Sequence, residues 1–383
     1  MKLNNIRNVT IIGAGPAGLT FAYHALRHNI NVKIYEGRRI FAFKPCGEAL
    51  AGDALEVLPF KLGYKYKWML SDMKYVKLYY NGIYYRTIKS PFGERGVIIN
   101  KREFLQSLAD IIEKEGGKIF MGNFYKGKDA DADLIIDSSG YLTFSRIYAK
   151  EIYKREYRLI PVIRDYAEAK DLLEEGYLLI DLLDRGYFWI FPYGKEYYNV
   201  GIGGLYDGET LKRIYEKKIK YFGLKIVKNT RQGASVSIGG LLSQRAFGKY
   251  YIIGEAAGYV MPTTGEGIRF SIFSAYEFFH PEENYVKILS KRIKFNAKLL
   301  RLAIDINQRL KSKLIAKAPE DLILVFLGEQ NVNIQKILSF LRTLVKEISI
   351  KDVQNTLFAL YDFLLNERVD LKENKIMNAL AGI

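Results

Sequence analysis

Residues 8–36, NVTIIGAGPAGLTFAYHALRHNINVKIYE, constrain the fold more than any other part of the chain. They predict a strand, a glycine-rich turn, a helix and a second strand ending on an acid, which is a complete dinucleotide-binding βαβ unit. In such a unit Gly13 allows the tight turn, Gly15 lets backbone N–H groups approach a pyrophosphate, and Gly18 lets the helix pack closely on the strand. Glu36 follows after about 20 residues, the interval expected for an acid that accepts hydrogen bonds from a ribose.

The turn GAGPAG lies close to the N-terminus, as it does in FAD-binding versions of this unit more than in NAD-binding ones. We therefore expect a flavoprotein whose cofactor is FAD. The sequence holds no second fingerprint for NAD(P)H. The electron donor is accordingly expected to be NAD(P)H that docks transiently, or a protein such as an acidic ferredoxin.

Composition bounds the class of protein. A chain of 383 residues predicts two or three folding units. The 58 Lys and Arg against 42 Asp and Glu give a net charge of +16, which favours an anionic partner or reflects a Lys-rich proteome. No nucleic-acid-binding signature accompanies the charge, so lipid headgroups or an acidic electron carrier are the expected partners, and nucleic acid is not.

Targeting and metal signals are weak. No apolar run approaches the roughly 20 residues of a membrane-spanning helix, and the N-terminal apolar segment is the first strand, so we expect a cytoplasmic protein, with a peripheral site at the inner face of the membrane as the alternative. The single cysteine, Cys46, excludes an internal disulfide, and no metal site is expected. His24 and His28 are interpreted as ordinary helix residues.

The rest of the chain predicts a discontinuous arrangement. Residues 74–88 read as a hairpin around Asn81-Gly82, and residues 99–120 read as a helix that stops at Gly116-Gly117 before a strand. The region from about 150 to 235 is mainly β, and a strand at 250–258 restores α/β character. The expected fold class is α/β, α+β overall: a discontinuous Rossmann-like FAD-binding domain, an inserted antiparallel β-sheet substrate domain and a helical C-terminal region. We place the first in residues 1–73, 89–150 and 236–281, the second in 74–88 and 151–235, and the third in 282–383.

A second motif, GEAAGYVMPTTGEGIRFSIFSA at 254–275, combines a strand end with an acid, a proline break and a glycine-bounded helix start. Glu255 is positioned to bind a ribityl hydroxyl, while Gly265 and Gly267 permit the backbone to lie against a flat ring. A helix N-terminus at this point would stabilise negative charge on a reduced flavin. A purely structural turn is the alternative.

Four segments occur in a fixed order: GAGPAG, KPCGEAL at 44–50, GYFWIFP at 186–192 and GEAAGYVMPTTGEGI at 254–268. Together they resemble the geranylgeranyl reductase family, FAD-dependent enzymes of the hydroxybenzoate-hydroxylase-like fold that saturate isoprenoid chains, including those of archaeal ether lipids. The resemblance covers roughly residues 5–280. It implies a substrate that is a geranylgeranylated lipid or a prenyl diphosphate, and an enzyme acting on carbon–carbon double bonds.

The resemblance also implies site residues. It assigns catalytic roles to Cys46, Tyr187 and Trp189. It assigns cofactor binding to Gly13, Gly15, Ala17, Gly18, Glu36, Cys46, Gly47, Arg102, Gly254, Glu255, Gly265, Gly267 and Ile268. No metal ligand is implied.

Three positions depart from the family pattern. Glu255 replaces the usual Asp, Asp184 stands where the aromatic motif has a leading proline, and DSSG at 137–140 replaces an ADG-type turn. The sequence therefore leaves open how residue 255 contacts the ribityl chain and how residues 137–140 contact the cofactor.

The chemistry explains the aromatic residues. An isolated alkene has no carbonyl to accept charge, so the transition state of its reduction should carry carbocation character, which aromatic faces stabilise by about 1 to 2 kcal/mol. Tyr187 and Trp189 alternate on one strand and point to the same face. With Phe191 they would otherwise form a sheet-core ladder, and Cys46 either donates the proton or packs against the flavin.

Two other functions remain open: a flavin monooxygenase or halogenase of the same fold, and a non-catalytic protein that binds flavin or prenyl lipid. The C-terminal segments mix apolar faces with Lys and Arg. They predict helices that cap an apolar tunnel and rest on an anionic membrane, or helices that simply cover the core.

Overall fold

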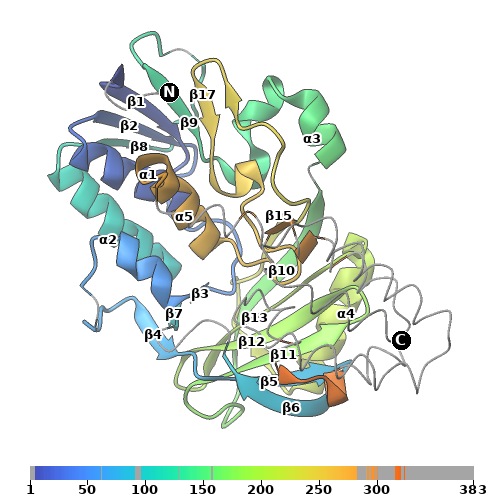
Figure 1. Ribbon diagram of the computed structural model, residues 1–383. Helices are drawn as coiled ribbons and strands as arrows, with labels where there is room; N and C mark the ends of the chain where they lie inside the picture. The colour runs from blue at the N-terminus through green and yellow to red at the C-terminus, as the bar shows by residue number, and fades with distance from the viewer. Residues whose placement is uncertain are drawn as a thin grey trace, which may run out of the picture.

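The computed structural model describes residues 5–282 apart from 62, 91–95, 128 and 157, together with short stretches between 290 and 323. Two large sheets and one small sheet organise these residues, with the helices α1, α2 and α5 grouped beside the first large sheet (Figure 1). The greater part of the predicted C-terminal helical region, 282–383, lies outside the described residues.

The first sheet has six strands and carries the dinucleotide unit. Its order is β16-β17-β9-β1-β2-β8, and all pairs are parallel except β16 with β17. The strands, in chain order, are β1 (Asn8–Ile12), β2 (Asn31–Glu36), β8 (Lys118–Met121), β9 (Leu134–Asp137), β16 (Ala246–Phe247) and β17 (Tyr250–Ile252). The predicted Rossmann-like domain is therefore confirmed.

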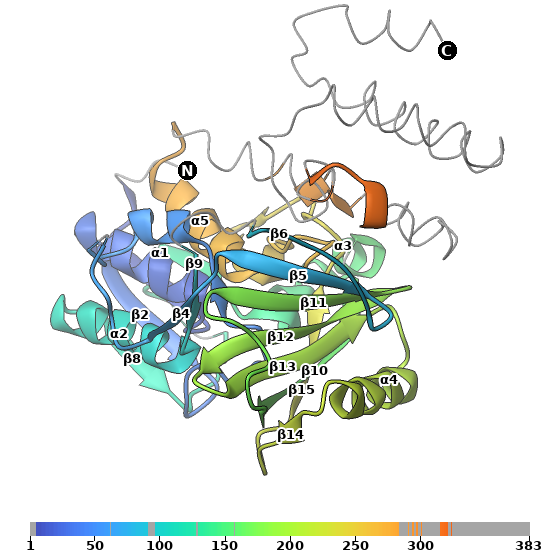
Figure 2. The ribbon, with the colours of Figure 1, turned by 90° about the horizontal axis from the view of Figure 1, so that it is seen from below.

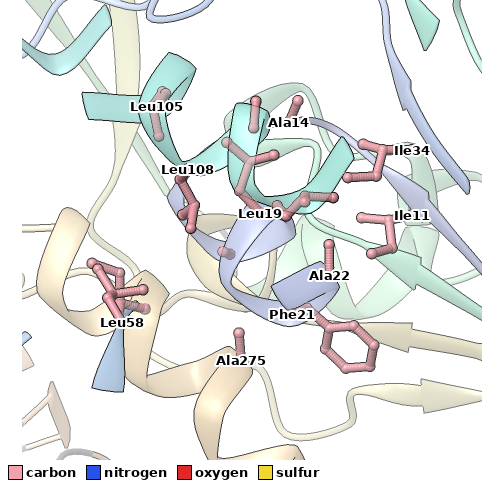
Figure 3. Packing of buried hydrophobic residues seen from close by; sticks show 14 of the residues in the cluster. Ile11, Ala14, Leu19, Phe21, Ala22, Ile34, Leu58, Leu105, Leu108 and Ala275 are labelled. Carbon is pink, nitrogen blue, oxygen red and sulfur yellow. The ribbon is translucent and has the colours of Figure 1, made fainter. Parts of the chain in front are cut away.

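Helix α1 (Pro16–Arg27) is the centre of the largest core. Its Leu19 and Phe21 are fully buried, between Ile11 and Ile34 of the sheet on one side and the helices α2 (Lys101–Lys114) and α5 (Ile268–Phe279) on the other (Figure 3). The side chain of Asn100 caps α2 by accepting a hydrogen bond from the Glu103 amide, and the predicted stop follows at Gly116.

The second sheet has the order β14-β10-β13-β12-β11-β5-β6, with β15 paired to β10 (Figure 2). The turn of the predicted hairpin is confirmed, because Asn81 and Gly82 both have positive φ, as a type I′ turn requires. The strands are β5 (Tyr75–Tyr80), β6 (Ile83–Lys89), β10 (Leu159–Glu168), β11 (Tyr177–Leu183), β12 (Gly186–Gly194), β13 (Tyr197–Gly204), β14 (Lys225–Ile226) and β15 (Gln232–Ser237).

Two features of this sheet differ from the prediction. The pair β5 and β11 is parallel, because the two strands come from distant parts of the chain and no tight turn links them. The stretch read as mainly β also contains α4 (Gly208–Tyr221). Its N-cap is Asp207, whose side chain accepts a hydrogen bond from the Thr210 amide at 2.8 Å. Helix α4 buries Leu211 and Tyr215 against the face of the sheet that points away from the first domain.

Short elements complete the described chain. The third sheet joins β3 (Ala49–Leu50), β7 (Val97–Ile99) and β4 (Met69–Asp72). One short helix, α3 (Lys150–Glu156), precedes β10, and 3-10 turns cover η2 (Gly52–Val57), η3 (Gly140–Leu142), η4 (Phe144–Ile147) and η5 (Gly254–Ala257). Among the described helices, none combines the length and the apolar character needed to cross a bilayer.

Candidate functional site

One cavity of about 460 Å³ is lined by residues of both large sheets. Its walls come from the glycine turn after β1, the loop at 44–47, the strands β10, β12, β13 and β15, and the segment that leads into α5. Most of the predicted site residues meet there: Gly13, Gly15, Ala17, Glu36, Cys46, Gly47, Tyr187, Trp189, Glu255, Gly265, Gly267 and Ile268.

Three predicted residues lie behind the wall or beside it. Gly18 and Gly254 are packing positions: a Cβ at Gly18 would lie 2.0 Å from the carbonyl oxygen of Gly13, and one at Gly254 would lie 2.8 Å from Cβ of Ala17. Arg102 is exposed and lines a separate, smaller cavity of about 200 Å³. Its neighbour Lys101 lines the main cavity instead.

The glycine turn is shaped to receive a diphosphate. Gly13 has φ +97° and donates its amide hydrogen bond to the Tyr35 carbonyl at 2.8 Å. A Cβ at Gly15 would meet no protein atom within 4 Å, because that side of the backbone faces the cavity. Gly15 is the N-cap of α1, whose first turn has neither a side-chain cap nor an acidic residue, so the amide groups of that turn and the helix dipole remain available to an anion.

Glu36 ends β2 at the edge of this turn. Its carboxylate accepts hydrogen bonds from the amides of Ala14 at 2.9 Å and Arg38 at 2.8 Å. Those two contacts fix the side chain beside the turn and leave lone pairs for a ribose hydroxyl. The residues present therefore fit the adenosine and diphosphate parts of FAD.

Glu255 makes contacts that the sequence did not suggest. Its carboxylate forms an ion pair with Lys44 and accepts a hydrogen bond from the Ser237 amide at 3.0 Å. Lys44 in turn lies 5.1 Å from the centre of the Tyr141 ring. The predicted ribityl acceptor thus lies in the cavity wall as half of an ion pair, and Lys44 is a cavity cation that the motif contained but the prediction missed.

The loop before α5 also faces the cavity. Gly265 has φ +68°, which favours glycine, and Gly267 is the N-cap of α5. The Tyr187 hydroxyl donates a hydrogen bond to the Thr264 carbonyl and so joins β12 to this loop. Burial, with a smaller effect from Cys46, raises the pKa of Tyr187 above its ordinary value, and the phenol stays protonated.

In the DSSG turn, which departs from the family pattern, the side chains of Asp137, Ser138 and Ser139 all form hydrogen bonds within the protein. Buried Asp137 accepts hydrogen bonds from the amides of Ser139 at 3.0 Å and Ser145 at 2.6 Å. Ser138 donates its hydroxyl to the carbonyls of Ile12 and Gly13, which supports the glycine turn from below. Asp184, the other departure, accepts a hydrogen bond from the Tyr80 hydroxyl at 2.7 Å.

Tyr187 and Trp189 line the cavity and also belong to the core of the sheet. Their ring centres are 6.0 Å apart, and the indole N–H of Trp189 donates to the Asn199 side chain at 2.9 Å. Phe191 does not line the cavity; its ring packs against Gly47, where a Cβ would lie 2.9 Å away. Tyr187 and Trp189 therefore lie in the cavity wall as well as against the sheet core, and Phe191 lies in the core alone.

Cys46 is half-buried, and its sulfur accepts a hydrogen bond from the Glu48 amide at 3.3 Å. The acid that follows, Glu48, is buried and contacts Asn199, which the prediction also missed. One sequence signal was present for each: Glu48 lies within KPCGEAL, and Asn199 is the polar residue in the apolar and glycine run YYNVGIGGL.

Comparison with known proteins gives a consistent picture. Residues 11–50 match the family model of an NAD(P)-binding Rossmann-like domain. A digeranylgeranylglycerophospholipid reductase of Methanosphaera stadtmanae is 26% identical over 302 residues, 70% of this chain and 75% of that protein. A menaquinone reductase of Mycolicibacterium smegmatis is 25% identical over 313 residues, 70% and 75% of the two chains.

Among solved structures, a geranylgeranyl bacteriochlorophyll reductase-like protein from Thermoplasma acidophilum matches with a TM-score of 0.65 at 18% identity, over 92% of this chain and 99% of that one. At this identity the likeness shows the fold. The dinucleotide-binding unit, together with the reductases among the sequence relatives, identifies the chain as an FAD-dependent oxidoreductase. The sequence relatives confirm, within that class, the resemblance to the geranylgeranyl reductases.

Proposed function

We propose that this protein saturates carbon–carbon double bonds in geranylgeranyl chains of membrane lipid precursors. The observation that carries the proposal is one cavity that joins a dinucleotide-binding turn to an apolar wall made by Tyr187 and Trp189. An isoprenoid chain is apolar and needs such a wall. The name of the Methanosphaera relative supports the same substrate class.

The residues that line the cavity have different roles in the proposed reduction of the double bond. One alkene carbon would receive hydride, which is the chemistry that bound, reduced FAD would supply. The aromatic faces of Tyr187 and Trp189 stabilise positive charge at the other carbon. That carbon must also receive a proton, and the thiol of Cys46, in the same cavity, is a group that can donate one.

The direct test is anaerobic. The protein is purified, its FAD is confirmed by absorbance, the flavin is reduced with dithionite, and a digeranylgeranylated glycerophospholipid is added. Reoxidation accompanied by mass gains of two hydrogens per step supports prenyl reduction. Flavin that stays reduced until oxygen is admitted contradicts it and favours the monooxygenase or halogenase alternative.

The proposal also covers the electron donor, the lipid headgroups that the protein contacts, and its location at the membrane. The net charge of +16 fits an acidic ferredoxin as electron donor and a peripheral contact with anionic lipid, while NAD(P)H is the other donor to test. Menaquinone, named for the Mycolicibacterium relative, also carries a prenyl chain, so the assay should compare a prenylated quinone with the phospholipid.

Trp189→Leu is expected to lower the rate of prenyl reduction about tenfold, because it removes an aromatic face worth 1 to 2 kcal/mol to a cationic transition state. The measurement is the single-turnover rate of flavin reoxidation by substrate. Trp68→Leu is the matched control, since Trp68 is equally buried but packs against Tyr66 and Phe104 in the first domain. Equal rate losses in both variants would contradict a role for the Trp189 face.

A further inference from the structure

A buried carboxylate lies directly behind the cavity wall. Glu48 is 4% exposed and follows Cys46-Gly47 at the point where the loop enters β3. Its φ of +62° is the left-handed conformation that non-glycine residues seldom adopt. The backbone is held there by a hydrogen bond from the Ile99 amide to the Glu48 carbonyl at 2.8 Å. A strained, buried acid beside the only thiol of the chain needs an explanation.

The Glu48 carboxylate is bonded on both oxygens. Oε2 accepts hydrogen bonds from the Tyr166 hydroxyl and from the Asn199 amide, each at 2.9 Å, and Oε1 accepts one from the Lys101 backbone amide at 3.2 Å. These donors come from β10, β13 and the start of α2. One side chain therefore connects the cysteine loop to both large domains.

Asn199 links Glu48 to two residues that line the cavity, Cys46 and Trp189. Its Nδ2 also donates to the Cys46 carbonyl at 2.8 Å, and its Oδ1 accepts the Trp189 indole N–H at 2.9 Å. Asn199 is fully buried, so none of these bonds competes with water. Two of the three predicted catalytic residues, Cys46 and Trp189, are thus held by one amide that Glu48 orients.

The charge in this network is partly balanced. Arg164 is 5% exposed, and its guanidinium lies 4.1 Å from the centre of the Tyr166 ring. Burial raises the pKa of Glu48, and the positive charge of Arg164 opposes that shift. Burying such a group costs free energy that an apolar residue of the same shape would avoid, so its presence is better explained by positioning than by stability.

We propose that Glu48 is a positioning residue which, through Asn199, sets the distance and orientation of Cys46 and Trp189 around the prenyl double bond. The inference rests on the proposed function for its chemistry, but its geometry does not depend on the substrate. Glu48 and Asn199 do not line the cavity themselves, so they do not contact a molecule bound in it. Their effect is on where the lining groups lie.

The test uses the fact that Cys46 is the single cysteine. The rate at which the holoenzyme reacts with iodoacetamide reports the position and accessibility of the Cys46 thiol, and this measurement needs no turnover of substrate. Glu48→Ala and Asn199→Ala are expected to change this rate at least several-fold. They should also lower kcat for prenyl reduction by about 100-fold, as expected for a 1 Å misplacement, with a much smaller change in KM. Glu48→Gln, which keeps the shape and one acceptor, should restore most of both.

A matched control is Asp181→Asn. Asp181 is fully buried in the same sheet, is paired with Lys218, and accepts the Gly82 amide at 3.0 Å, away from the cavity lining. This variant should lower Tm and leave alkylation of Cys46 at the wild-type rate. If Glu48→Ala does not fold, Asn199→Ala and Glu48→Gln decide the matter.

Two outcomes would overturn the inference: wild-type alkylation and kcat in folded Asn199→Ala, or an equal change in Asp181→Asn. Failure of the proposed function looks different. In that case the wild-type enzyme does not reduce any prenyl lipid, yet the alkylation rates still distinguish the Glu48 and Asn199 variants from the control. The positioning of Cys46 can therefore be tested whether or not the substrate assignment holds.

Discussion

Gly15→Ala is expected to bind FAD about 10- to 100-fold more weakly while the apoprotein unfolds at the wild-type Tm. The added Cβ meets no protein atom within 4 Å and the φ of −84° suits alanine, so the fold has no reason to change. The methyl group instead occupies the space through which the start of α1 approaches a diphosphate, and such overpacking costs about 1 to 3 kcal/mol. Flavin retained after gel filtration and the thermal midpoint of the apoprotein give the two readings.

Gly18→Ala provides the contrast. Its Cβ would lie 2.0 Å from the Gly13 carbonyl oxygen and 2.6 Å from the Ser138 hydroxyl, so α1 must move off β1. We expect both FAD retention and apoprotein stability to fall, the latter by about 2 to 4 kcal/mol. If Gly15→Ala lowers the apoprotein Tm as much as Gly18→Ala does, the first turn of α1 is a folding element and not a cofactor cradle.

Acidification from pH 6.5 to pH 4 is expected to remove about 3 kcal/mol of folding free energy through His24 alone. Burial is the main cause that lowers the pKa of His24 from 6.5 to about 4, and its side chain is only 8% exposed. A folded-state pKa below the unfolded value means that the unfolded chain binds the proton more readily. The stabilisation is therefore complete above pH 6.5 and is lost as the pH falls toward 4.

Urea unfolding at several pH values measures this slope. His24 Nε2 lies 2.9 Å from the Val57 carbonyl, so His24→Gln keeps a donor at that position but cannot titrate. The variant should show a flatter dependence of unfolding free energy on pH over this range. An unchanged slope in His24→Gln would contradict the assignment.

Local sequence patterns predicted the elements whose structure depends on near neighbours. The βαβ unit, the Asn81-Gly82 hairpin and α2 follow from glycine positions, turn chemistry and helical spacing within short windows. Helix α4 was missed although Asp207 caps it, because the surrounding strands dominated the interpretation of that region.

The contacts that join distant segments could not be predicted in the same way. Glu48 and Asn199 are 151 residues apart, and Lys44 and Glu255 are 211 apart. Each residue stood in a motif or an unusual position, but nothing local to Lys44 specifies that its partner is Glu255. Pairings of this kind are fixed by how elements distant in the sequence pack together, which is a property of the whole fold.

The parallel pairing of β5 with β11 has a consequence for how the chain folds as it is synthesised. The hairpin of β5 and β6 emerges from the ribosome well before β11, and two strands alone are marginally stable in water. Until residues 177–183 arrive, the edge of β5 remains open to other chains. The first domain also needs β17, which arrives later still, so both sheets close only near the end of the described chain. Because its strands pair across such long stretches of chain, this interleaved connectivity favours slow folding.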